Sequence, residues 1–173
     1  MASKTVKRCM KDARNLLTKG SEKIVGYSEE NNIRRFYCLI EGFEDTDYEG
    51  GHFIFEIFHD ESYPFKAPSI KCLTPTGRFY VNTKLCFNFS DFHQESWSPA
   101  WDTEKICTAI ISSMIATDIN EFGSGHYNLS SPESKNKKYY TKDSRQYNRL
   151  NHPVIYDKLL VLLAQKKEKM KKK

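Results

Sequence analysis

The 173-residue sequence lacks any long hydrophobic run, and this lack excludes several classes of protein. No stretch approaches the roughly 18 consecutive apolar residues that a membrane span needs. The first residues, MASKTVKRCMKDARNLL, alternate charged and apolar positions and have no continuous apolar core, so they do not form a signal peptide. Internal repeats and Gly/Ser-rich linkers are also missing. The sequence therefore predicts a soluble chain, and its length and 39% hydrophobic content fit a single domain with one core.

Cysteine is scarce, and its pattern excludes two further classes. The five cysteines are an odd number without CxxC spacing, and they stand at positions 9, 38, 72, 86 and 107. Neither a disulfide framework nor a zinc site is indicated, and a reducing compartment is expected. The five histidines are scattered as well, so we predict no metal site. Because the chain has no GxxxxGK[ST] or GxGxxG loop, we expect no cofactor, and nucleotide chemistry would belong to another protein.

Hydrophobic periodicity predicts an α+β fold. One apolar stripe at helical spacing indicates an amphipathic N-terminal helix with a basic outer surface, and its members are Val6, Met10, Ala13 and Leu17. Aromatic and β-branched runs then predict a four-stranded antiparallel meander, around KIVGYS, RRFYCLIEG, HFIFEIFHD and SIKCL. The turns between the later runs contain glycine or proline.

A long irregular segment follows the predicted strands, and helices complete the chain. Asp102 or Thr103 can cap a helix whose inner face would hold Ile106, Ile110, Ile111, Met114 and Ile115. Residues 130–150 predict a polar helix with Ser131 near its cap and Pro132 at its first position, and residues 152–167 predict a last helix. We expect one domain over residues 1–165 and a frayed basic tail over residues 166–173.

Six short motifs occur in one order along the chain: YEGGHF, YPFKAPSIKCLTP, GRF, NTKLC, SDFH and WSPAW. With them the chain resembles the ubiquitin-conjugating enzymes, most closely the branch whose members are typically tail-anchored in the endoplasmic reticulum membrane. The resemblance covers roughly residues 6–150. It implies a catalytic domain with a long active-site segment, and as partners ubiquitin, an activating enzyme that uses the ATP, a RING-type ligase and protein substrates. We expect a cytoplasmic location, at the endoplasmic reticulum surface if a membrane tail was removed.

Cys86 is the central candidate residue. An isolated cysteine between apolar residues is usually a small buried hydrophobe, and we interpret Cys38, Cys72 and Cys107 in this way. Cys86 lies between polar runs of the irregular segment, which favours the mouth of a groove. The resemblance implies that Cys86 takes ubiquitin as a thioester, which stays reactive towards a lysine or a hydroxyl acceptor.

One departure from the family pattern concerns the mechanism. Where the family usually has His-Pro-Asn or Thr-Pro-Asn, this chain has Thr74-Pro75-Thr76. The family asparagine is credited with holding the active-site loop or donating to the developing oxyanion, and the shorter threonine would not reach the same place. We therefore expect either slow discharge or a donor from Asn82 or Asn88. The alternative for Thr76 is a plain turn residue.

His93 follows Cys86 by seven residues and is the candidate general base for discharge. A histidine accepts a proton near neutral pH, and an attacking lysine or hydroxyl must lose one. Asp91 could orient His93 or steer the acceptor. The alternative is that His93 only hydrogen-bonds the loop backbone.

Partner surfaces are implied by the resemblance too. Two loops match those that engage RING-type ligases, and their candidate residues are Phe65, Pro99 and Ala100. The same residues could merely end a strand and begin a helix. The basic face of the first helix is similar to the face that meets the activating enzyme, and its residues are Lys4, Lys7, Arg8 and Lys11.

Two other functions remain open. A ubiquitin-binding variant with weak or lost catalysis would share the fold, but such variants generally lack the cysteine. A nucleic-acid-binding accessory role is suggested by the net charge of +5 and by the segment KNKKYYTKDSRQYNR. No recognised base-reading motif accompanies that segment, so the enzyme is the favoured interpretation.

Overall fold

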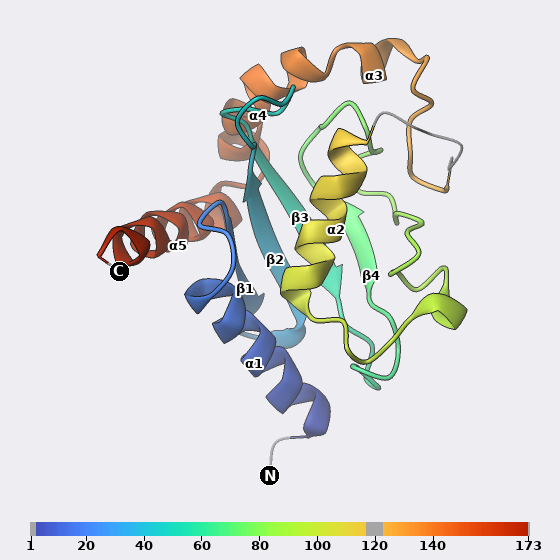
Figure 1. Cartoon of the computed structure of the whole chain (residues 1–173), viewed down its shortest axis with the longest axis vertical. Coiled ribbons are helices and arrows are strands. Elements are labelled where there is room, and N and C mark those ends of the chain that lie inside the picture. Colours follow the sequence, from blue (N-terminus) through green and yellow to red (C-terminus); the bar gives the residue numbers. More distant parts are fainter. Residues whose placement is uncertain (1–2, 117–122, 173) are drawn as a thin grey trace.

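A four-stranded antiparallel sheet is the middle layer of the structure, a computed structural model that describes residues 3–116 and 123–172 (Figure 1). The strands pair in sequence order, and they are β1 (Ile24–Glu29), β2 (Asn32–Glu41), β3 (His52–Phe58) and β4 (Ser69–Cys72). The predicted meander is confirmed.

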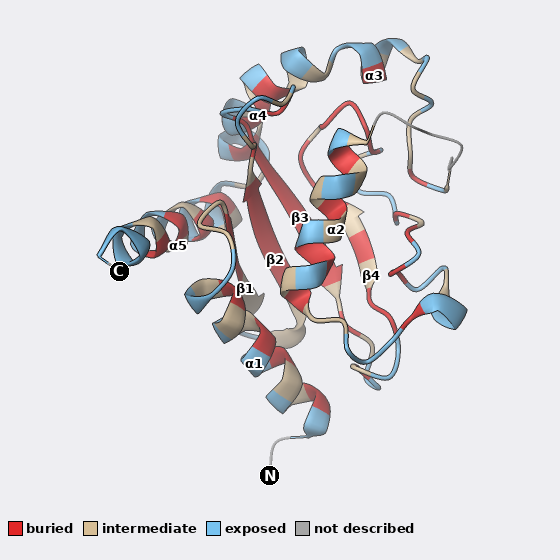
Figure 2. Cartoon of the chain, in the orientation of Figure 1, coloured by how far each residue is buried: buried red, intermediate tan, exposed pale blue. Residues whose placement is uncertain are grey.

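Helices cover both faces of this sheet, which explains why its strands are so apolar (Figure 2). They are α1 (Lys4–Thr18) and α2 (Thr103–Ile115) on one face and α5 (Pro153–Lys171) on the other. Successive side chains of a strand point to opposite faces. Phe53 and Phe55 therefore join the core with α1 and α2, whereas Ile54 packs with Tyr156 and Leu159 of α5.

The buried face of α1 is not the apolar stripe that its sequence predicts. Each buried residue precedes a member of that stripe by one position, and they are Thr5, Cys9, Asp12 and Leu16. Met10 is 57% exposed. Asp12 accepts hydrogen bonds from the Tyr63 hydroxyl and from the Arg8 guanidinium. Burial raises the pKa of Asp12, while these two donors oppose the rise, so a bonded carboxyl helps to decide which face is inside.

Aromatic rings hold the irregular segment between β4 and α2. Phe79 packs on Phe55 of β3 with ring centroids 6.1 Å apart, and on Phe87 at 5.5 Å. Phe87 stacks on Phe89 at 4.7 Å, and Phe89 stacks on Trp101 at 5.2 Å. A short 3-10 helix, η1 (Gln94–Ser96), lies within the segment. The segment is thus anchored by side chains although most of it has no ladder of backbone hydrogen bonds.

Helix α2 begins where expected, because the Asp102 carboxylate accepts a hydrogen bond from the Lys105 backbone N–H at 2.9 Å. Its inner face contains Ile106, Ile110 and Met114, but Ile115 is 46% exposed rather than inside.

The predicted polar helix over residues 130–150 is two helices, α3 (Pro132–Lys135) and α4 (Lys137–Asn151), which meet at Asn136. Ser131 caps α3 as expected, accepting from the Ser134 N–H at 3.2 Å. The buried face of α4 is polar. Its Asn148 amide donates to the His52 carbonyl at 2.8 Å and accepts from the Thr74 hydroxyl at 2.6 Å.

The expectation of a frayed tail from residue 166 is wrong for the described residues, because α5 continues to Lys171. Lys166 is 3% exposed, and its ammonium donates to the carbonyls of Leu16, Ser21 and Ile24 at 2.7, 2.7 and 2.9 Å. Burial lowers the pKa of Lys166. The apparent tail therefore fastens α5 to the end of α1 and the start of β1. Lys173 lies outside the described residues.

We predict that Lys166→Ala lowers the free energy of unfolding by about 2 kcal/mol or more, because three carbonyls lose a charged donor. Urea unfolding followed by circular dichroism measures this. The exposed Lys169→Ala, one turn later in α5, is the control and should change stability by less than about 0.5 kcal/mol. Equal stability of the two variants would contradict the anchoring role of Lys166.

Candidate active site

Cys86 differs from the other cysteines in exposure. It is half-buried, whereas Cys9, Cys38, Cys72 and Cys107 are at most 2% exposed. This confirms the buried interpretation of Cys38, Cys72 and Cys107. The preceding residue, Leu85, donates its N–H to the Ile70 carbonyl of β4 at 2.9 Å, and the Cys86 N–H donates to the Ser124 carbonyl at 2.9 Å. The backbone of Cys86 is thereby held from both sides.

The imidazole of His93 lies beside the Cys86 thiol, with Nε2 3.2 Å from Sγ. On the other side of the ring, Nδ1 lies 2.9 Å from the Glu95 carboxylate. His93 sits at the N-terminal cap of η1, and its backbone N–H donates to the Ser90 carbonyl at 3.0 Å. The turn and the short helix therefore bring together three side chains that span ten residues.

The carboxylate fixes which ring nitrogen of His93 carries the proton. A hydrogen bond from its own backbone N–H, and then the His93 ring, lower the pKa of the exposed Glu95 carboxyl. An ionised carboxylate only accepts hydrogen bonds, so Nδ1 of His93 is the donor. The lone pair of neutral Nε2 then faces Cys86. Nε2 of His93 can therefore accept a proton from a group at the position of the Cys86 sulfur.

Asp91 does not orient His93. Its carboxylate lies 2.6 Å from the Lys84 ammonium in a surface ion pair, and the partner of the imidazole is Glu95. The sequence places Asp91 and Glu95 at equal distances from His93, two residues before and two after. Only the geometry of η1 distinguishes them.

Thr76 lies in a buried turn. It is 0% exposed, and its hydroxyl oxygen accepts from the backbone N–H groups of Arg78 and Phe79 at 3.0 and 3.1 Å. This geometry supports the turn interpretation rather than an oxyanion donor. Asn82 and Asn88 are both exposed. Asn82 adopts a left-handed backbone conformation (φ 59°), which asparagine tolerates better than most residues.

Gly123 was not a candidate in the sequence, yet it lies against the thiol. A Cβ built on it would come within 2.8 Å of the Cys86 Cβ and 3.2 Å of its sulfur. No side chain fits there without a shift of the backbone. The glycine-rich sequence around Gly123 and Gly125 was the available signal, since glycines often mark a close approach of backbone to another group.

The two loops predicted to face a ligase lie together. The Trp97 indole N–H donates to the Pro64 carbonyl at 2.8 Å, and the Gln94 amide bonds the backbone of Phe65 and Ala67. Phe65 is 67% exposed. Pro99 and Ala100 are exposed as well, so all three candidate residues are accessible to a partner.

The basic face of α1 is smaller than expected. Lys4, Lys7 and Lys11 are exposed. Arg8 is different, because its guanidinium forms an ion pair with Asp12 and donates to the carbonyls of Pro99 and Trp101. Arg8 thus ties α1 to the loop before α2 and is not a free surface cation.

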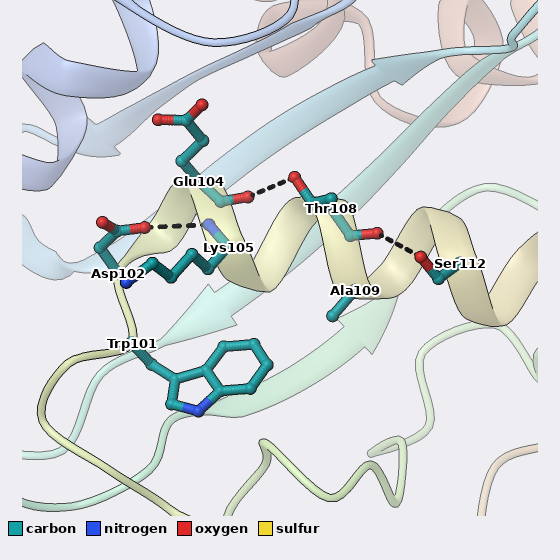
Figure 3. Close-up of a pocket in the computed structure, with 7 residues that line it drawn as sticks. All are labelled: Trp101, Asp102, Glu104, Lys105, Thr108, Ala109 and Ser112. Atoms are coloured by element: carbon teal, nitrogen blue, oxygen red, sulfur yellow. Dashed lines mark hydrogen bonds between the residues drawn. The ribbon is translucent and has the colours of Figure 1, made fainter.

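A groove of about 460 Å³ runs along the exposed side of α2, where Trp101 and Ala109 face each other (Figure 3). Its polar groups are largely bonded within the helix, as in the hydrogen bond from the Thr108 hydroxyl to the Glu104 carbonyl. Cys86 does not line this groove, so it is not the reaction centre.

Residues 3–116 and 123–172 contain neither a metal-binding cluster nor a helix that could span a membrane. No group of three or more His, Cys, Asp and Glu side chains in these ranges is arranged to hold a metal ion. No helix formed by these residues has both the length and the apolar character needed to cross a bilayer.

Comparisons with known proteins point to one family. Residues 8–149 match the family model described as ubiquitin-conjugating enzyme. Ubiquitin-conjugating enzyme E2 6 of Schizosaccharomyces pombe is 36% identical over 154 residues, which are 88% of this chain and 65% of that protein. The protein of the same name from Eremothecium gossypii is 34% identical over 90% of this chain and 62% of its own length. Ubiquitin-conjugating enzyme E2 34 of Arabidopsis thaliana is 37% identical over 68% of this chain and 50% of its own length. The chain spans less than two thirds of each of these relatives.

We predict that a mild alkylating agent labels Cys86 before any other cysteine of the native protein. Burial raises the pKa of Cys9 to about 11 and also raises that of Cys72, so both are poor nucleophiles as well as inaccessible. Peptide mass spectrometry after short exposure to iodoacetamide locates the label. First labelling of a buried cysteine would show that Cys86 is not the accessible thiol.

Proposed function

Because the chain belongs to the ubiquitin-conjugating enzyme family, we propose that it accepts ubiquitin as a thioester on Cys86 and transfers it to an amine or hydroxyl acceptor. The observation that carries the proposal is the contact between the accessible Cys86 thiol and Nε2 of His93 at 3.2 Å. A catalytically weak ubiquitin-binding variant would have no need of this arrangement.

Loading exchanges one thioester for another. The Cys86 sulfur attacks the carbonyl carbon of the ubiquitin thioester on the activating enzyme, and the thiolate of that enzyme leaves. In the free protein, Nε2 of His93 lies where it can accept the proton of the Cys86 thiol as the sulfur attacks. The activating enzyme consumes the ATP, and this chain needs no cofactor for the exchange.

Discharge, the transfer of ubiquitin from Cys86 to the acceptor, depends on a base more than loading does. The acceptor nitrogen or oxygen attacks the thioester carbonyl, its proton goes to Nε2 of His93, and the Cys86 thiolate leaves. Glu95 stabilises the imidazolium that forms because its carboxylate is hydrogen-bonded to Nδ1. A hydroxyl acceptor depends on the base most, because a neutral hydroxyl is a poorer nucleophile than a neutral amine and must lose its proton as it attacks.

The negative charge on the carbonyl oxygen needs a hydrogen-bond donor during both steps. Thr76 is unsuited, because it is buried and its hydroxyl oxygen already accepts two backbone N–H groups. We expect the donor to be Asn82 or Asn88. Both residues are exposed, and in the sequence one precedes and the other follows Cys86.

Two surfaces fit the partners of such an enzyme. Phe65 with Pro99 and Ala100 offers a rigid apolar surface for a RING-type ligase, supported by the hydrogen bond between Trp97 and Pro64. Lys4, Lys7 and Lys11 offer exposed positive charge to an activating enzyme, without Arg8. A cytoplasmic location stays a prediction of the sequence resemblance, with the endoplasmic reticulum surface as the place only if a membrane tail was removed.

The test of the proposed function is incubation with activating enzyme, ATP and ubiquitin, followed by a non-reducing gel. We expect one ubiquitin adduct that reducing agent destroys. Cys86→Ser should give an adduct that resists reductant, because an oxyester replaces the thioester, and Cys86→Ala should give none. A reductant-sensitive adduct on Cys86→Ala would place the nucleophile at another residue.

A second prediction separates His93 and Glu95 from Asp91. His93→Ala should slow discharge to a hydroxyl acceptor by about 10²-fold, with a smaller effect on lysine and little effect on loading. Glu95→Gln should slow discharge less, because the amide oxygen still accepts from Nδ1 but carries no charge. Single-turnover discharge of the purified thioester measures each rate.

Asp91→Asn is the matched control, since Asp91 is bonded to Lys84 and not to the imidazole. It should discharge at close to the unmodified rate. A slowed Asp91→Asn variant would show that Asp91 steers the acceptor, whereas an unmodified rate for Glu95→Gln would contradict the role of Glu95 as the partner of His93.

A further inference from the structure

Tyrosine side chains line a surface that leads from the active site to α4. They come from three parts of the chain that meet in space, and they are Tyr80, Tyr127, Tyr139, Tyr140 and Tyr147. The rings of Tyr80 and Tyr127 lie 4.0 Å apart, and those of Tyr139 and Tyr140 lie 5.6 Å apart. The proposed transfer reaction makes no use of these residues.

The surface begins next to the nucleophile. Ser124 accepts a hydrogen bond from the Cys86 N–H, and its neighbour Gly125 accepts one from the Tyr80 N–H at 2.8 Å. The Tyr127 N–H donates to the Arg78 carbonyl at 2.9 Å, and a Cβ built on the neighbouring Gly77 would lie 2.9 Å from the Tyr140 ring, so this turn links Tyr127 to Tyr140. The thioester and the first tyrosines are therefore supported by the same short segment.

A pocket of about 160 Å³ ends this surface at α4. Its lining residues are Pro75, Tyr139, Tyr140, Asp143, Ser144 and Tyr147. A cavity of this size accommodates one ring-sized apolar group. Tyr139 is 64% exposed at the edge of this pocket, so its ring is accessible to a bound segment.

Positive charge borders the pocket. Lys135, Lys138 and Lys142 are exposed, and none forms an ion pair with any residue in the part of the chain that the structure describes. Lys138 and Lys142 are one turn apart on α4 and flank Tyr139 and Tyr140 in sequence. An anionic group beside an apolar one would complement this surface.

We propose that this tyrosine-lined surface docks the acceptor polypeptide, as a segment with an apolar side chain for the pocket and carboxylates for the lysines. The proposal rests on the proposed transfer at Cys86, which requires a protein segment beside the thioester. Asp143 lines the pocket, and Glu133 lies at the same surface, since a Cβ built on Gly77 would contact both the Glu133 carbonyl and the Tyr140 ring. A peptide can present neutral residues to these carboxylates, whereas a nucleic acid carries a phosphate at every nucleotide.

The experiment measures binding of a fluorescein-labelled dodecapeptide that contains leucine and glutamate but no lysine, by fluorescence anisotropy with the unloaded protein. The double variant Tyr139→Ala/Lys142→Glu should raise its Kd by about tenfold or more. The matched control on α5, Met170→Ala/Lys169→Glu, makes the same kinds of change at exposed positions and should leave the Kd unchanged. An equal Kd for both variants would overturn the proposal.

A second measurement uses the loaded enzyme and the same peptide with one added lysine as acceptor. The double variant should raise KM about tenfold while the limiting rate of discharge stays the same, as expected for a binding contribution alone. A lower limiting rate with unchanged KM would overturn the docking role. If the double variant weakened the binding of a dodecamer of thymidine nucleotides but left the binding of the peptide unchanged, the surface would be assigned to nucleic acid instead.

The peptide experiment stands apart from the test of catalysis, because it needs no thioester. Failure of Cys86 to load, with the peptide effect intact, would contradict the proposed function but support the surface. Normal loading and discharge, with no difference in peptide binding between the two double variants, would support the proposed function but contradict the docking surface.

Discussion

The packing of aromatic rings against β3 is the interaction on which the rest of the site depends. The segment between β4 and α2 has few regular hydrogen-bonded elements, so its backbone would be free without side-chain anchors. Phe79 contacts Phe55 and Phe87, and the series continues through Phe89 to Trp101. Fully burying one such side chain contributes about 1.5–3 kcal/mol, which opposes the entropy cost of ordering the loop. Cys86 lies directly before Phe87, which fixes the sulfur relative to the sheet.

A polar network holds the two loops of the proposed ligase surface in place, as the aromatic rings hold Cys86. Asp12 binds both Tyr63 and Arg8, and Arg8 also reaches the carbonyls of Pro99 and Trp101. The helix, the loop after β3 and the loop before α2 therefore share one buried carboxyl. A change at this carboxyl would disturb the fold and the proposed ligase surface together, since leaving a buried charged group without its partners is costly.

The chemistry and the proposed acceptor surface meet at the segment of residues 123–127. Gly123 allows this backbone to touch Cys86, Ser124 accepts the Cys86 N–H, and Tyr127 begins the path to α4. The acid–base pair of His93 and Glu95 lies on η1, in a different part of the irregular segment. Nucleophile, base and docking surface thus come from separate stretches of chain, each held by its own contacts.

Strand order, the helix over residues 103–115 and the identity of Cys86 follow from the sequence, because periodicity and motif spacing are local properties. The choice between Asp91 and Glu95, the loss of Arg8 from the free surface and the inward position of Lys166 do not. Each depends on which groups the folded backbone brings within hydrogen-bond reach, and composition carries no information about that. Helix α1 is a further example. Its buried face is displaced by one residue from the apolar stripe, because the Asp12 carboxylate accepts a hydrogen bond from Tyr63 in the loop after β3. The sequence by itself determined the strands and the main helices and singled out Cys86 as the candidate nucleophile. The tertiary structure decided which polar side chains support them, since a charge is buried only where packing supplies its partners.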